Sequence, residues 1–136
     1  MVRSFAFDWC VHGQINQNNM FRQSGVTALL DSAMEGYACC VLAYGQTGSG
    51  KTYTMSGVEE LASDEDRDVF STSTQGLIPR SMEYLYGKVD QFERGRYTIR
   101  ASFCEIYNEQ VYDLLHVTSD VLPVRWNENN GFFVQV

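Results

Sequence analysis

The segment that most constrains the fold is a glycine-rich turn that matches the pattern G-x-x-x-x-G-K-[ST] in full. It consists of Gly45, Gln46, Thr47, Gly48, Ser49, Gly50, Lys51 and Thr52. The glycines allow a sharp turn whose N–H groups can approach phosphate oxygens. Lys51 can reach the β- and γ-phosphates, and the hydroxyl of Thr52 can bind Mg²⁺. The spacing therefore predicts a site for the phosphates of ATP or ADP with Mg²⁺ at the start of a helix.

The context of this turn favours a ligand over a glycine turn without one. Residues 39–44 form a short apolar run just before it, which is expected for a central strand buried on both faces. Residues compatible with a helix follow directly. This order of strand, turn and helix is the context in which the pattern binds phosphate.

The rest of the chain alternates expected strands and helices. Alternating apolar residues predict strands over 3–11 and 97–103, and a hairpin of residues 122–126 and 132–136 around a turn at 127–131. Helical spacing predicts helices over 20–35 and 78–94, with Asn16 as the cap of the first and Gly36 after its end. We expect a layered α/β sheet and find no domain boundary between residues 1 and 136.

Charge and hydropathy exclude other classes of protein. The net charge of −7 argues against nucleic acid as a partner. Residues 59–68 alone carry six acidic side chains and one arginine, so we interpret 57–75 as a long acidic surface loop rather than a regulatory segment. The longest apolar run, residues 37–44, is far shorter than the ~20 residues of a membrane helix. We therefore expect an intracellular protein without membrane insertion.

The four cysteines are expected to be reduced and buried, because their spacing fits neither a disulfide framework nor a metal site. They are Cys10, Cys39, Cys40 and Cys104.

Hydrolysis would need groups that the residues do not clearly provide. A P-loop NTPase requires an acidic residue on a second strand and a group that positions water. Asp8 and Glu105 are the candidates for the acidic residue, but neither follows a run of aliphatic residues, and no Asp-x-x-Gly occurs. The residues alone thus predict nucleotide binding without a complete set of catalytic residues.

The residues around the turn carry a more specific resemblance. Residues 43–57, which read AYGQTGSGKTYTMSG, closely resemble the phosphate-binding signature of kinesin motor domains. Similar patches occur in the family's order and spacing: FAFD at 5–8, Gln17 ahead of Met20 and Phe21, GLIPR at 76–80, and SFCEIYNE at 102–109 followed by DLL at 113–115. On these motifs, which cover essentially the whole chain, it is identified as a member of the kinesin superfamily.

The resemblance implies the P-loop NTPase-type fold of a kinesin motor domain. It implies a parent protein that couples ATP hydrolysis to movement along microtubules, in the cytoplasm and on the cytoskeleton, with a coiled coil through which it could dimerise. On this reading Tyr53 stacks on adenine, the alternative being that it only packs against the helix start. Residues 57–75 correspond to a loop that interrupts the second helix, and residues from about 121 to 136 to a lobe that contacts tubulin.

The chain also departs from the family pattern. Ala38 follows Gly36 and Tyr37 where the family usually has Asn. The Ser-Ser-Arg-Ser-His and Asp-Leu-Ala-Gly-Ser-Glu switch segments are missing, as is the main tubulin-binding helix, so we expect an incomplete motor domain. Three hypotheses follow: an ATP-binding fragment of a motor, a short non-catalytic product that binds nucleotide or tubulin, or a partly folded piece with an exposed sheet edge.

Overall fold

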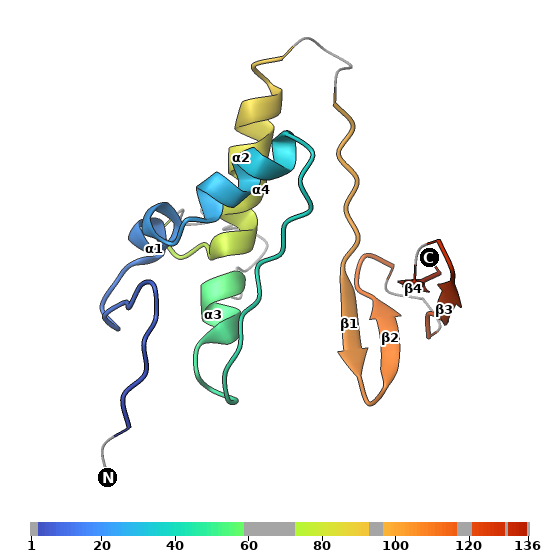
Figure 1. Ribbon diagram of the computed structural model, residues 1–136, viewed down its shortest axis with the longest axis horizontal. Coiled ribbons are helices and arrows are strands. Elements are labelled where there is room, and N and C mark those ends of the chain that lie inside the picture. Colours follow the sequence, from blue (N-terminus) through green and yellow to red (C-terminus); the bar gives the residue numbers. More distant parts are fainter. Residues whose placement is uncertain (1–2, 59–72, 93–96, 117–120, 130, 136) are drawn as a thin grey trace, which may run out of the picture. The chain divides into compact units, whose positions relative to one another are not determined.

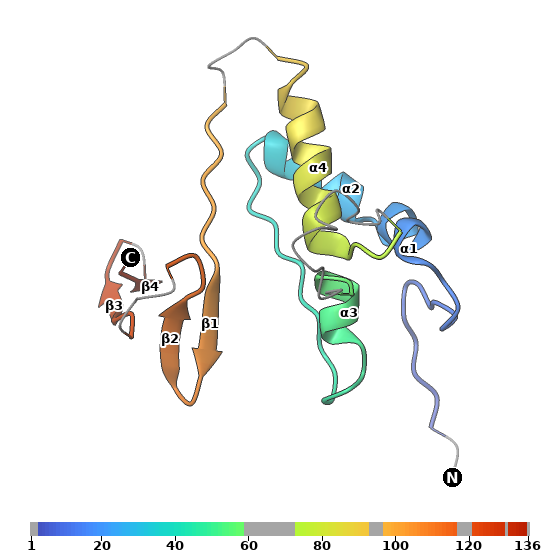
Figure 2. The same ribbon diagram turned by 180° about the vertical axis from the view of Figure 1, so that it is seen from behind.

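The computed structural model describes residues 3–58, 73–92, 97–116, 121–129 and 131–135, which fall into two compact units, 1–94 and 95–136. Within the described residues, the first unit contains helices α1 to α4 and the second contains two β-hairpins (Figure 1, Figure 2). None of the described helices has the length and apolar character that crossing a bilayer requires.

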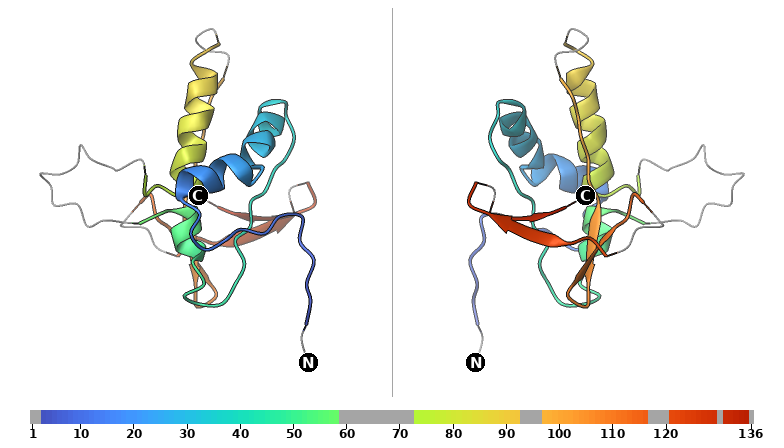
Figure 3. Two further views of the ribbon diagram at one scale, coloured as in Figure 1. Left: turned by 90° about the vertical axis from the view of Figure 1, so that its left-hand side faces the viewer. Right: turned by 90° about the vertical axis from the view of Figure 1, so that its right-hand side faces the viewer.

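Two short helices occupy the region for which the sequence predicts one helix over 20–35. Helix α1 (Gln17–Gln23) begins earlier than predicted, and Asn16 caps it because its Oδ1 accepts a 2.8 Å hydrogen bond from the Asn19 N–H. Gly25 then adopts a left-handed conformation (φ 80°) and separates α1 from α2 (Val26–Met34). The bend between them is visible in Figure 3. The predicted end at Gly36 is confirmed, because its φ is 101° just beyond α2.

The core of the first unit is small and lies between helices. Its centre is formed by the buried side chains of Phe21, Val26 and Leu77. Four partly buried side chains pack around them: Met20, Leu30, Met55 and Tyr84. The rings of Phe21 and Tyr84 meet edge to face, with centroids 6.3 Å apart and an interplanar angle of 67°.

Helix α4 (Leu77–Val89) is joined to α2 by a polar cluster of Asp31, Tyr84 and Lys88. The Tyr84 hydroxyl donates a 2.8 Å hydrogen bond to Asp31 Oδ1, and Lys88 Nζ lies 3.0 Å from the same oxygen and 5.2 Å from the Tyr84 ring centre. The Tyr84 hydroxyl and the Lys88 ammonium lower the pKa of the Asp31 carboxyl, and Asp31 in turn raises the pKa of Lys88. The C-terminal end of the helix predicted over 78–94 lies partly outside the described residues.

The predicted strands over 3–11 and 39–44 are not observed. Both segments run extended, but neither forms a ladder with other described residues. Burial of 39–44 on both faces is also wrong, because Leu42 is 82% and Tyr44 95% exposed. A strand needs backbone partners on a neighbouring strand, and no described residue supplies them here. The four cysteines are free thiols as expected, but they are exposed rather than buried.

The two ends of the predicted acidic loop lie side by side. Gly57 and Gln75 form an antiparallel bridge, and the Val58 N–H donates to the Thr74 carbonyl at 3.2 Å. Gly57 has a φ of 95°, and a Cβ there would collide with the Thr74 carbonyl oxygen. Residues 59–72, which hold the acidic cluster, lie outside the described residues.

The second unit contains a hairpin that the sequence analysis missed. Strand β1 (Cys104–Tyr107) pairs antiparallel with β2 (Gln110–Asp113), so that Ile106 lies opposite Val111. Asn108 and Glu109 connect the strands with φ values of 48° and 63°, which suit a two-residue hairpin turn. The predicted strand over 97–103 is wrong, because the strand begins at Cys104 and only Phe103 of the predicted segment joins the pairing, through a 2.8 Å hydrogen bond from the Leu114 N–H to its carbonyl.

The predicted hairpin at the C-terminal end is confirmed with slightly different bounds. Strand β3 (Val124–Asn127) pairs antiparallel with β4 (Gly131–Val134), and Trp126 lies opposite Phe132. A single antiparallel bridge between Val111 and Leu122 connects the two hairpins within this unit. The side chains of Trp126 and Phe132 are both exposed.

Candidate nucleotide-binding site

The glycine-rich turn has the predicted form of a loop that leads into a helix. The Ser49 N–H donates to the Gln46 carbonyl at 3.2 Å, and a Cβ at Gly45 would meet the Ser49 hydroxyl. Gly48 and Gly50 adopt left-handed conformations, with φ values of 77° and 91°. Glycine adopts such angles at little cost, which explains its place at both positions.

Helix α3 (Lys51–Met55) begins directly after Gly50. Its first hydrogen bond runs from the Thr54 N–H to the Gly50 carbonyl at 2.8 Å. The N–H groups of the first residues of a helix have no partners within the helix, so they are available to an anion. Lys51 and Thr52 therefore stand where the motif requires them.

Lys51 bends back across its own loop. Its Nζ donates hydrogen bonds of 2.8 Å to the carbonyl oxygens of Gly45 and Gln46. Because an ammonium group has three donors, the third can bind a phosphate oxygen without breaking these two bonds. The lysine is thereby held over the turn.

A cavity of about 320 Å³ lies at this loop. It is lined by Thr47, Gly48, Gly50, Lys51, Thr52 and Tyr53. The structure thus brings together six of the nine residues predicted to bind nucleotide, while Gly45 and Gln46 contact the lysine from the same turn. Thr52 is exposed, so its hydroxyl is accessible to a hydrated cation, which fits Mg²⁺ because this ion takes few protein ligands beside phosphates and waters.

Tyr53 stands between this cavity and a second one. Its side chain is 50% exposed. The second cavity, of about 380 Å³, is lined on one side by Ser49, Gly50, Tyr53 and Thr54. Its other side comes from the segment that leads into α1, including His12, and from Gln17 at the first position of α1. Space for a planar ring therefore exists next to Tyr53, in addition to the space at the phosphate loop.

The structure adds one residue that the sequence analysis did not assign to the site. Gln17 is only 3% exposed, and its Nε2 donates a 2.6 Å hydrogen bond to the Tyr53 carbonyl. The spacing in the sequence could have indicated that Gln17 is buried, because Gln17 and Phe21 lie four residues apart and therefore share one face of a helix. A polar residue on such a face needs a partner.

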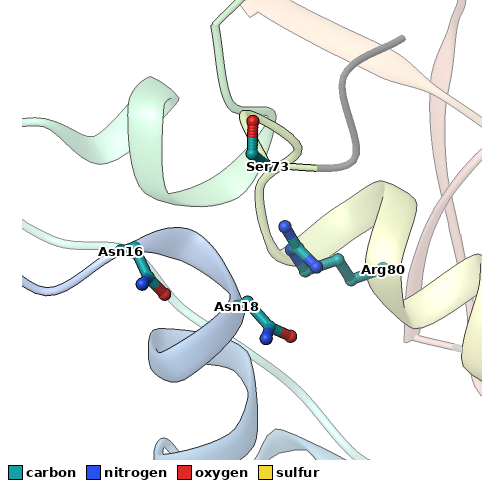
Figure 4. A pocket seen from close by; sticks show the side chains of 4 residues that line it. All are labelled: Asn16, Asn18, Ser73 and Arg80. Carbon is teal, nitrogen blue, oxygen red and sulfur yellow. The ribbon is translucent and has the colours of Figure 1, made fainter. Parts of the chain in front are cut away.

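A further cavity of about 370 Å³ lies away from the loop, between the start of α1 and the start of α4. Figure 4 shows the four side chains that line it: Asn16, Asn18, Ser73 and Arg80. The Arg80 Nε donates a 2.9 Å hydrogen bond to the Gln75 carbonyl, so this arginine helps to hold the start of α4.

The two candidates for a second acidic residue lie on different parts of the chain. Asp8 lies on the extended segment 3–11 and is exposed, and Glu105 lies on β1 in the other unit. Among residues 3–58, 73–92, 97–116, 121–129 and 131–135, no three His, Cys, Asp or Glu side chains gather into a metal site.

Comparison with known proteins gives a consistent result. The model of the kinesin motor domain matches residues 1–136. The kinesin-like protein KIN-12F of Oryza sativa subsp. japonica is 40% identical over 138 residues, covering 96% of this chain and 5% of that protein. The mouse kinesin-like protein KIF12 is 39% identical over 133 residues, covering 97% of this chain and 20% of that protein. The chain therefore spans only a small part of these relatives.

Solved structures resemble the chain in the same way. A fast kinesin is matched with a TM-score of 0.82 and 34% identity, over 96% of this chain and 34% of that one. The Drosophila kinesin family member Kin10/NOD, in complex with divalent manganese and ADP, is matched with a TM-score of 0.62 and 33% identity, over 84% of this chain and 38% of that one. These matches confirm the expected fold class, a P-loop NTPase-type kinesin motor domain of which the chain is a part.

Proposed function

This chain belongs to the kinesin motor domain family, and on that premise we propose that it is the ATP-binding portion of a microtubule motor. The parent protein couples ATP hydrolysis to movement along microtubules. The observation that carries the proposal is the loop of residues 45–52, where left-handed glycines and a bent-back lysine adjoin a cavity at the start of a helix. Helix starts with glycine-rich loops of this kind suit phosphate groups.

Each residue of the loop has a distinct role in this proposal. The backbone N–H groups at Gly48 and Gly50 and the Lys51 ammonium bind the phosphate oxygens. The Thr52 hydroxyl is a ligand of Mg²⁺, which neutralises charge on the β- and γ-phosphates when bound. The Tyr53 ring stacks on adenine, and the cavity beside it is large enough to admit a base.

The second unit carries the proposed contact with tubulin. We assign that contact to the lobe of residues 121–136, where the hairpin of β3 and β4 displays Trp126 and Phe132 side by side. Exposed aromatic side chains are enriched in protein interfaces. The protein then acts in the cytoplasm, on the microtubule cytoskeleton.

The 136 residues alone bind nucleotide without turning it over. They contain no Ser-Ser-Arg-Ser-His segment and no Asp-Leu-Ala-Gly-Ser-Glu segment. Positioning of the attacking water is a separate requirement that a phosphate loop cannot meet. Microtubule-stimulated hydrolysis is expected only after addition of both segments, and stimulated turnover by the 136-residue chain would contradict this part of the proposal.

Calorimetric titration with Mg·ATP and Mg·ADP tests the site. Lys51→Ala should weaken binding by roughly 1.5–3 kcal/mol, the contribution of a charge-assisted hydrogen bond to phosphate. Lys88→Ala is the matched control, because this lysine lies on α4 and contacts Asp31 rather than the loop. Equal affinities of the unmodified chain and Lys51→Ala would refute the assignment.

A further inference from the structure

The starting observation is the burial of Gln17. It is the one buried polar side chain in the part of the chain that the structure describes. It lies on α1 next to the core residue Phe21, and its hydrogen bond of 2.6 Å reaches across 36 positions of the sequence to the Tyr53 carbonyl. A buried amide is costly unless it is hydrogen-bonded, so this contact has to be maintained in the folded protein.

The Tyr53 carbonyl lacks a partner from its own helix. The N–H groups of Ser56 and Gly57, which follow α3, both donate to the Thr52 carbonyl, at 2.8 and 3.3 Å. The Val58 N–H donates to Thr74 at 3.2 Å instead. Among the described residues, Gln17 is therefore the recorded donor to this carbonyl, and it supplies the bond that a longer helix would have made.

We propose that Gln17 is a positioning residue that fixes Tyr53 and thereby makes the site favour ligands with a base over bare polyphosphate. Gln17 and Tyr53 line the same cavity of about 380 Å³. The phosphate loop is held by other bonds, from Lys51 to Gly45 and Gln46 and from Thr54 to Gly50. Gln17 therefore affects binding of the base in the cavity beside Tyr53 and does not affect binding of the phosphates at the loop. This inference rests on the proposed nucleotide binding.

The test compares two ligands, Mg·ATP and magnesium tripolyphosphate, by competition against a fluorescent ATP analogue. Gln17→Met keeps the size of the side chain but removes the donor. It should weaken ATP about tenfold, the equivalent of one hydrogen bond, and leave tripolyphosphate unchanged. The matched control is Gln23→Met, at the exposed C-terminal end of α1, which should change neither affinity.

A double-mutant cycle with Tyr53→Ala separates positioning from general support of the fold. Once the ring is removed, Gln17→Met should cause no further loss of ATP affinity. Equal losses of ATP and tripolyphosphate, or full additivity with Tyr53→Ala, would overturn the inference. If the unmodified chain binds neither ligand, both this inference and the proposed nucleotide binding are wrong. If the unmodified chain binds both and Gln17→Met behaves identically, the inference alone fails.

Discussion

The helices of the first unit and its two extended segments differ although both are rich in apolar residues. Helices α1, α2 and α4 bury Phe21, Val26 and Leu77 against each other. The segments 3–11 and 39–44 have more strongly apolar sequences than α1 but remain exposed and unpaired among the described residues. A helix makes its backbone hydrogen bonds within itself, whereas a strand depends on a neighbour.

The second unit shows which strands can form when each strand needs a neighbouring strand for its hydrogen bonds. Strands β1 and β2 are joined by the two residues Asn108 and Glu109, and β3 and β4 by a turn of similar size. Each strand thus finds its partner a few positions along the chain. The comparison indicates that sequence separation of the partner, rather than strand propensity, decides which elements are present.

The largest effect on stability is expected when a phenylalanine of the helical core is replaced by alanine, and the same replacement in an extended segment serves as the comparison. Phe21→Ala should destabilise the first unit by about 3–5 kcal/mol, because a buried ring is replaced by a cavity. Phe5→Ala, on the exposed segment 3–11, should have little effect on stability. Thermal melting followed by the helical circular dichroism signal measures the stability of both variants. Similar losses of stability would contradict the view that Phe21 is in the core and Phe5 is not.

A smaller effect is expected from a charge placed on the unpaired segment. An exposed, apolar extended segment is a template for pairing with another chain, so the protein should self-associate through residues 39–44. Leu42→Lys should raise the concentration at which the protein self-associates about tenfold, because burial of a leucine side chain in the contact contributes roughly 1.5–3 kcal/mol to association.

Sedimentation velocity over a range of concentrations decides this point. Leu29→Lys is the control, because Leu29 is a partly exposed leucine on α2 and lies outside the extended segment. A monodisperse monomer at all concentrations, or the same shift for both variants, would contradict the prediction.

The smallest effect is expected at the polar cluster between α2 and α4. The pKa of Asp31 lies below the 3.8 of an ordinary aspartate, so its contribution to stability is present above about pH 4 and is lost as the pH falls through the lowered pKa. The pKa of Lys88 lies above 10.5, so its contribution is present below pH 10.5 and is lost as the pH rises through the raised pKa.

Melting temperatures of the unmodified chain and Asp31→Asn should therefore differ slightly at pH 7 and converge as the pH falls through the lowered pKa of Asp31. The difference is small because both charged side chains are partly exposed, so that water screens their interaction. A difference that grows in acid would mean that the carboxyl is not stabilised in its charged form.

The parts of the structure that could be predicted from the sequence depend on local interactions. The phosphate loop, the cap at Asn16, the left-handed Gly36 and the hairpin of β3 and β4 are each determined by residues a few positions apart. The break at Gly25 was missed because the apolar spacing continues through it, although glycine there permits the φ of 80° that separates α1 from α2.

The errors concern contacts between residues that are distant in sequence. The predicted strands over 3–11, 39–44 and 97–103 were inferred from apolar runs, which report a tendency to be buried but not the presence of a partner. Gln17 is part of a recognisable motif, but the sequence does not indicate its role, because its partner Tyr53 is 36 positions away. The assignment of Tyr53 to adenine remains a prediction.

The bent-back lysine has a consequence for the entropy that phosphate binding costs. The Gly45 and Gln46 carbonyls hold the ammonium of Lys51 at 2.8 Å, and both bonds can persist when the third donor meets a phosphate oxygen. The long lysine side chain therefore has little conformational freedom left to lose when it binds an anion. Ordering of this kind before binding strengthens binding because it reduces the entropic cost.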